Sequence, residues 1–306
     1  MKKILIKSFF FLLLIAASTL PLLKFISKDF ADKFYYKFTY KAQSLILGSS
    51  RTLLSIDPES VNKKKWITSP LLNYGFTQAT SPYGEIYYKA ICKKLLDSGK
   101  QGCFILEVNP IGMSTDTKKS KLPEEGLILD RLLLFNINPN IDYILENTQA
   151  PLYLFFFNDK KKAGEIEHFH KSGWVENIAV TDSIKKSKKI ASQTREYQKV
   201  FDTYTLSDYR KNWFEKTIDE LSLFGKVIVI RVPITPKMKN MENIYYPDFN
   251  KMIFSIALKH SVPYLDFSEI TGYNFNDLHH MSSESAIKFS EFLGDTLQKI
   301  DVTLSK

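Results

Sequence analysis

Cysteine is scarce in this chain: Cys92 and Cys103 are the only two among 306 residues. Cys92 falls in a helix-like segment and Cys103 begins a strand-like one, so we expect two separate core thiols rather than a bridge. So sparse a pair excludes a disulfide framework. No cysteine follows the apolar run near the N-terminus, which argues against a lipoprotein anchor. Internal repeats and low-complexity tracts are also absent, and the length suits a chain with a large buried core.

A concentrated basic surface is the second missing feature. The net charge is +9, but it comes from lysines scattered along the whole chain, and runs such as 63–65 and 160–162 are interpreted as solvated surface. Nucleic-acid binding would need basic residues gathered on one face with aromatic residues between them, and no such stripe is legible. A nucleic-acid partner is therefore not expected, whereas a negatively charged envelope or polysaccharide surface would suit the charge.

The N-terminus carries lysines from Lys2 to Lys7, followed by an apolar run at 8–17, which is the pattern that export machinery reads. Residues 4–26 could supply the ~20 residues that cross a bilayer. We predict an uncleaved transmembrane helix in segment 1–27, with a cleaved signal peptide as the alternative. We thus predict a single-pass protein of the cell membrane whose remaining domain lies outside the cytoplasm.

After this segment, residues 28–306 are expected to form one α/β domain. Short apolar runs bounded by Gly, Pro or Asn predict strands at Ser44–Leu47, Cys103–Val108, Leu152–Phe157, Val227–Val232 and Tyr264–Phe267. Amphipathic stretches between them predict helices at Pro82–Leu96, Thr194–Phe224 (with a break), Asp248–Lys259 and Ser283–Leu297. This alternation predicts a parallel sheet covered by helices on both faces. Insertions are expected near 114–140, over the site, and near 158–190, at the surface.

Two short segments at opposite ends of the domain carry the chemistry. The first strand runs into a Gly-Ser-Ser turn that places Ser50 at the carboxyl edge of the sheet, and Asp277 and His280 lie on one loop before the last helix. A serine needs such partners to become a nucleophile at neutral pH. We predict Ser50 as nucleophile, His280 as base and Asp277 as its orienting carboxylate. Two alternatives stay open: Asp277 and His280 could cap the last helix, and His279 is a rival base.

Four other polar or glycine positions are candidates for binding. The backbone N–H of Gly75 and the side-chain amide of Asn109 would add donors to an oxyanion hole beside the Ser50 N–H. Asn73, in the same turn as Gly75, could instead only satisfy that turn. Arg51 could hold an anionic substrate group, but pairing with an internal carboxylate is the favoured interpretation.

His168 and His170 form the other noticeable cluster. A His-x-His pair on a strand can bind zinc, although further ligands would be needed. We expect no metal and no cofactor.

These segments resemble the SGNH/GDSL hydrolase superfamily, in particular its membrane-anchored envelope branch, which is similar to proteins of alginate O-acetylation and teichoic-acid D-alanylation. Residues 48–51 (Gly-Ser-Ser-Arg) match the nucleophile block, 73–75 (Asn-Tyr-Gly) the glycine block, Asn109 the asparagine block, and 277–280 (Asp-Leu-His-His) the Asp-x-x-His block. Ser49 replaces the Asp of the Gly-Asp-Ser form, and the third block lacks a Gly-x-Asn-Asp signature.

The resemblance implies a three-layer α/β/α fold, mainly parallel and flavodoxin-like, with ester chemistry that uses no metal. It implies an exported serine esterase or O-acyltransferase acting on acyl esters of a cell-envelope glycan through an acyl-Ser50 intermediate. Its partners would be an acylated glycan or small acyl ester and a membrane acyltransferase. The alternative function is a non-catalytic envelope assembly or glycan-binding protein on the same fold, which the aromatic residues Trp174, Tyr245 and Tyr246 would suit.

Overall fold

A parallel sheet lies at the centre of the computed structural model, which describes residues 2–304 except 31, 68–69, 78, 97–98, 119–127, 148–165 and 179–182. The five strands run in the order β2-β1-β3-β8-β9, and each neighbouring pair is parallel. Their bounds are β1 Ser44–Leu47, β2 Leu71–Asn73, β3 Gly102–Glu107, β8 Gly225–Arg231 and β9 Tyr264–Asp266. The predicted parallel sheet is confirmed, whereas the strand predicted at Leu152–Phe157 lies outside the described residues.

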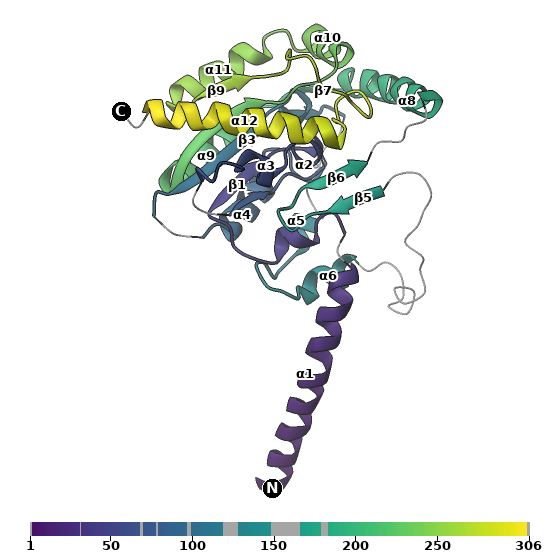
Figure 1. The fold of residues 1–306 in the computed structure, drawn as a ribbon, viewed down its shortest axis with the longest axis vertical. Coiled ribbons are helices and arrows are strands. Elements are labelled where there is room, and N and C mark those ends of the chain that lie inside the picture. Colours follow the sequence, from purple (N-terminus) through teal and green to yellow (C-terminus); the bar gives the residue numbers. More distant parts are fainter. Residues whose placement is uncertain are drawn as a thin grey trace.

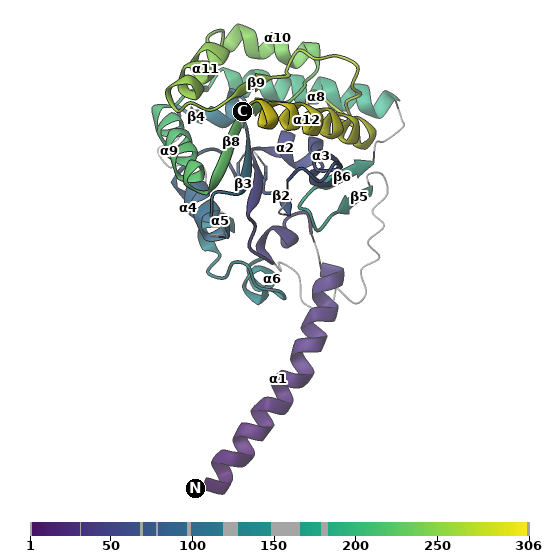
Figure 2. The ribbon, with the colours of Figure 1, turned by 60° about the vertical axis from the view of Figure 1, so that its left-hand side comes forward.

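Two layers of helices cover the sheet because alternate strand residues point to opposite faces. On β1, Leu45 and Leu47 belong to one buried cluster and Ile46 to a second. The first cluster includes side chains of α4 (Glu85–Lys94), α9 (Asp208–Phe224), α10 (Pro236–Tyr245) and α11 (Phe249–Lys259). The second includes side chains of α3 (Pro58–Val61) and α12 (Ser283–Leu304), and α12 also contacts α2 (Ser50–Ser55). Figure 2 shows the sheet between these two layers, which makes the fold α/β/α.

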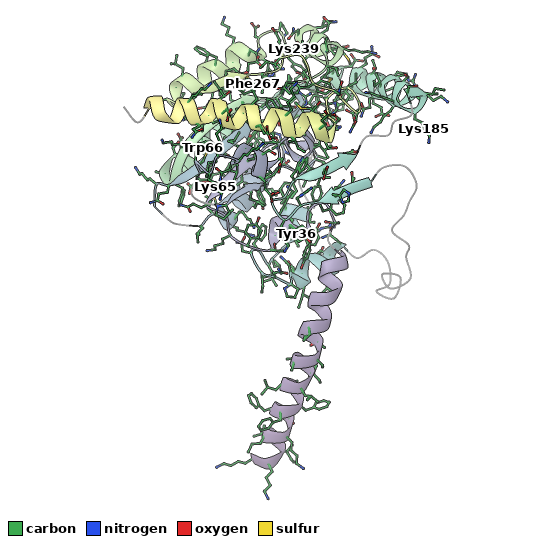
Figure 3. The ribbon with its side chains drawn as sticks, viewed as in Figure 1. Tyr36, Lys65, Trp66, Lys185, Lys239 and Phe267 are labelled. Atoms are coloured by element: carbon green, nitrogen blue, oxygen red, sulfur yellow. The ribbon has the colours of Figure 1, made fainter. Side chains whose placement is uncertain are left out.

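The last helix shows how its sequence determines this packing. Ala286, Phe289, Leu293 and Leu297 recur at helical spacing, and each is at most 2% exposed. Phe267, which follows β9 and is labelled in Figure 3, meets the Phe289 ring edge-on at a centroid distance of 5.6 Å. The predicted apolar face of this helix is confirmed.

The remaining elements lie around the sheet. The predicted break in the long helical segment is confirmed, because α8 (Ser183–Phe201) and α9 are separated by β7 (Tyr204–Leu206). β7 pairs with β4 (Ser114–Asp116), and β5 (Ile166–Phe169) forms a hairpin with β6 (Val175–Ile178). Three-residue and four-residue 3₁₀ turns occur at Ile111–Met113 and Tyr35–Phe38, and two further short helices are α5 (Ile128–Arg131) and α6 (Ile141–Asn147). α5 packs against α4, so this part of the 114–140 insertion covers the helix layer, whereas β4 at its start pairs with β7.

The N-terminal helix α1 (Lys2–Phe30) extends away from the α/β domain (Figure 1). None of the helices, over the residues that the structure describes, combines the length and apolar character that crossing a bilayer requires. In the sequence of this helix the uncharged stretch runs from Ser8 to Leu23, between Lys7 and Lys24, and is shorter than the ~20 residues that a span needs. The predicted single-pass membrane anchor is wrong on this finding.

Candidate active site

Ser50 stands at the carboxyl end of β1, as the first residue of α2. The chain turns there at Gly48, whose φ of +144° is one that side chains rarely adopt, and a Cβ at this position would lie 2.7 Å from a Glu107 carboxylate oxygen. Ser49 caps the helix, because its hydroxyl accepts a hydrogen bond from the Arg51 N–H at 3.3 Å. Ser50 is half-buried, and its hydroxyl faces a cleft.

The loop that precedes α12 is shaped by Asp277. Its Oδ1 accepts hydrogen bonds from the backbone N–H groups of His279 (3.1 Å) and His280 (2.9 Å), and Phe275 pairs with Met281 across the base of the loop. The carboxylate therefore folds its own loop and holds the imidazole of the residue three positions later.

The predicted triad comes together at the sheet edge. His280 Nδ1–H donates to Asp277 Oδ2 at 2.8 Å, and His280 Nε2 lies 2.9 Å from Ser50 Oγ. Both distances are within hydrogen-bonding range for a base and its partners. Residues from the start and the end of the domain thus form a continuous hydroxyl–imidazole–carboxylate line.

The Asp277 carboxylate is held ionised although it is only 2% exposed. Burial alone would raise its pKa, but the hydrogen bond from His280, the charge of His280 and the backbone N–H of His279 outweigh burial and bring the pKa well below its usual value. Gln193 Nε2 donates to the same carboxylate oxygen at 3.2 Å, and Lys189 Nζ lies 3.7 Å from it. An ionised carboxylate at this point favours the imidazolium that a general base forms.

His279, the rival base, lies beside the triad without joining it. Its Nε2 is 3.2 Å from the Tyr197 hydroxyl, its ring packs against His280 with centroids 4.0 Å apart, and its Nδ1 has no partner among the described residues. Burial and then the charges of His280 and Arg51 lower the pKa of His279 well below its usual value. His279 is therefore a neutral neighbour, and His280 is the residue placed to take the Ser50 proton.

The Ser50 backbone N–H is the best placed oxyanion donor. Ser50 occupies the first helical position of α2, where a backbone N–H has no partner within the helix. Such an N–H, next to the nucleophile's own hydroxyl, can donate to an oxygen that becomes negative during acyl transfer.

The other predicted donors lie nearby but are engaged within the protein. Asn73 Oδ1 accepts the Gly75 N–H at 3.0 Å, and Asn73 Nδ2 donates to the backbone oxygens of Thr52 and Ile56, both at 2.8 Å. Asn73 thus bonds α2 to the end of β2. This is the alternative role considered for Asn73, in which its side chain satisfies the turn. Asn109 Nδ2 donates to Ser49 Oγ at 3.2 Å and to a neighbouring carboxylate, so Asn109 supports the nucleophile turn.

That carboxylate, Glu107, is a residue that sequence reasoning missed. It ends β3, is 1% exposed, and accepts hydrogen bonds from the Ser49 N–H (3.1 Å), the Ser49 hydroxyl (3.1 Å) and the Thr52 hydroxyl (3.3 Å). Its second oxygen accepts from Asn109 at 3.0 Å. The available signal was an acidic residue within the apolar Cys103–Val108 run, where a charge would need partners.

Arg51 points into the protein rather than into the cleft. Its guanidinium lies 2.5 Å from Glu242, whose other carboxylate oxygen lies 2.5 Å from Arg231. All three side chains are at most 5% exposed. The favoured interpretation, pairing with an internal carboxylate, is confirmed.

Helix α8 supplies residues that the sequence did not single out. It begins away from the body of the molecule, where Lys185 points outward (Figure 3), and its later turns reach the site. Gln193 bonds the 277–280 loop twice, because its Oε1 also accepts the Leu278 N–H at 3.2 Å. Tyr197 bonds His279. A polar residue on an amphipathic helix carries no mark of such a role in the sequence.

A cleft of about 470 Å³ opens beside Ser50 and His280. One wall is the face of α8 that presents Gln193, Glu196, Tyr197 and Val200. The opposite wall comes from α2 and from the β5–β6 hairpin, including Val175. The 158–190 segment, predicted as a surface excursion, therefore also borders the site.

The residues of the triad loop could also serve as metal ligands. Asp277, His279 and His280 offer ligand atoms within 4.8 Å of one another. Among the described residues, they form the one group of three side chains that could hold a metal ion. Two of these ligand atoms already bond each other. His170 bonds Glu176 at 3.0 Å and stacks on Trp174, so the His-x-His pair is engaged in its hairpin.

No known protein family, curated protein or solved structure matches this chain. The resemblance to the SGNH/GDSL superfamily stays a prediction from the sequence.

Proposed function

We propose that this protein is a serine esterase or O-acyltransferase that works through an acyl-Ser50 intermediate. The observation that carries the proposal is the line of contacts from Ser50 Oγ to His280 Nε2 (2.9 Å) and from His280 Nδ1 to the ionised Asp277 (2.8 Å). The same arrangement of groups turns a weak hydroxyl into a nucleophile on unrelated folds.

The proposed reaction has two stages. His280 takes the Ser50 proton as the hydroxyl attacks the ester carbonyl, and the Ser50 N–H donates to the oxygen that becomes negative. His280 then gives its proton to the departing alcohol, leaving the acyl group on Ser50. In the second stage an acceptor hydroxyl, from water or from a sugar of the glycan that the resemblance implies, loses its proton to His280 and takes the acyl group. Asp277 holds the imidazole throughout.

A fluorophosphonate probe tests the nucleophile directly. We expect stoichiometric labelling of the wild-type protein at Ser50, and loss of labelling in Ser50→Ala. The matched control is Ser192→Ala, which removes an exposed serine hydroxyl on α8 that bonds Glu196. Labelling and turnover of p-nitrophenyl acetate should survive a chelator, because no step uses a metal. Labelling that persists in Ser50→Ala, or its absence in folded wild-type protein, would refute the proposal.

A further inference from the structure

The cleft beside Ser50 changes character along its length. At one end α8 presents Gln193, which bonds Asp277 of the triad. Val200 lies on the same face of α8, about 10 Å further along the helix axis. Between them Tyr197 contacts His279. The groove therefore begins at the reacting groups and leads away from them along one helix.

Part of this groove is aliphatic. Leu53 and Leu54 follow Ser50 by one turn of α2, so they lie on the helix face next to the nucleophile. Leu54 and Val200 are half-buried at the cleft, while Leu53 and Val175 are buried in its wall. An apolar chain seated against the half-buried Leu54 and Val200 would gain free energy with each of its methylenes that leaves water.

The charged residues that line the cleft lie at exposed positions. Lys33, Glu167 and Glu196 are all exposed, and Arg51 is turned inward to Glu242. Among the described residues that line the cleft, the buried ones thus offer no ionic partner for a polar acyl group. A small acetyl group would also leave the aliphatic wall uncovered.

We infer that the acyl group of the substrate is an aliphatic chain longer than acetyl, seated between α2 and α8 against Leu54 and Val200. This inference rests on the proposed function and specifies its substrate class. The carbonyl carbon lies at Ser50, and the alkyl chain runs along the groove, while the alcohol part leaves through the open, polar side.

Chain-length preference tests the inference. We expect kcat/KM for p-nitrophenyl hexanoate to exceed that for p-nitrophenyl acetate by at least about 10-fold, as methylenes in a hydrophobic pocket typically discriminate. Val200→Phe, which fills the groove, should lower the hexanoate-to-acetate ratio by about 10-fold. Ile184→Phe, a matched change on α8 at a residue 67% exposed and outside the cleft, should leave the ratio unchanged.

The outcomes separate this inference from the function on which it rests. Turnover of acetate equal to or faster than that of hexanoate in the wild-type protein would overturn the acyl-chain inference and leave Ser50 as the nucleophile. If Ser50 is labelled but neither ester turns over, the labelling rates of ethyl and octyl fluorophosphonates are compared. Equal labelling rates would overturn the acyl-chain inference. Absence of both labelling and turnover would refute the proposed function, and the inference would fall with it.

Discussion

Glu107 joins the two segments of the sequence that surround the nucleophile turn. One oxygen accepts from the N–H and hydroxyl of Ser49, and the other accepts from the side chain of Asn109. Because Ser49 immediately precedes Ser50, this buried carboxylate sets the orientation of the nucleophile and its N–H without touching a substrate. It is a positioning residue in the proposed reaction.

Replacing Glu107 with Gln should expose this role. The amide has the same shape, but its NH₂ group must face a donor at either Ser49 or Asn109, so at least one hydrogen bond is lost. We expect a loss of ~1–3 kcal/mol in the free energy of unfolding. Misplacement of the nucleophile should lower kcat by roughly 100-fold with little change in KM. Thermal unfolding and steady-state kinetics measure the two effects.

Glu59→Gln is the control for this change, because Glu59 is exposed on α3. It should alter neither stability nor kcat. A Glu107→Gln variant that lost stability but kept its kcat would show that Glu107 stabilises the fold without positioning the nucleophile.

Among the helices and strands, the triad loop depends on α8. Gln193 donates to the Asp277 carboxylate and accepts from the Leu278 N–H, so this one side chain fixes both the carboxylate and the backbone of the loop. The position of α8 and the geometry of the triad are therefore linked.

Gln193→Glu tests this link through a pH profile. The introduced carboxylate can still accept the Leu278 N–H, but it replaces the donor to Asp277 with a like charge. Added negative charge favours the protonated base, so the acid limb of the kcat/KM profile should move to higher pH by about one unit. Gln198→Glu, which places the same charge at an exposed position of α8, should leave the profile where it is. An unmoved acid limb in Gln193→Glu would contradict the link.

The same elements show what a sequence can predict here. Periodicity predicts α12 and the parallel strands, and the Gly-Ser-Ser turn and Asp-x-x-His spacing predict the triad, because both are local patterns at element ends. Glu107 reaches the nucleophile turn at Ser49, and Gln193 reaches the 277–280 loop, so the partners that give them a role lie far away in the chain and nothing local marks them. The predicted membrane span is the opposite error: the window 4–26 is apolar on average, but Lys7 and Lys24 leave only a short uncharged stretch between them.

At the scale of the whole molecule, two buried lysines connect distant segments. Lys94 Nζ donates to the Tyr40 backbone oxygen and to the Asn136 side chain, while Lys37 Nζ donates to the backbone oxygens of Asn73 and Gly173. Both lysines are fully buried. Burial lowers the pKa of Lys94 from 10.5 to about 7, and burial followed by the Lys94 charge lowers the pKa of Lys37.

Lys94 should therefore make the fold more stable as the pH rises from 7 to 9. Over this window the unfolded chain keeps a proton on Lys94 that the folded protein has released, so the free energy of unfolding increases by up to ~1.4 kcal/mol per pH unit. Below the folded pKa both states are protonated and the contribution no longer changes. Above about pH 10 the buried tyrosines reverse the sign, because burial raises the pKa of residues such as Tyr87. In urea unfolding at pH 7, 8 and 9, Lys94→Met should reduce this rise to the part that Lys37 contributes, whereas Lys93→Met, at the exposed neighbouring position, should retain it. Equal slopes for Lys94→Met and the wild-type protein would mean that Lys94 stays charged in the folded state, with its two oxygen acceptors compensating for burial.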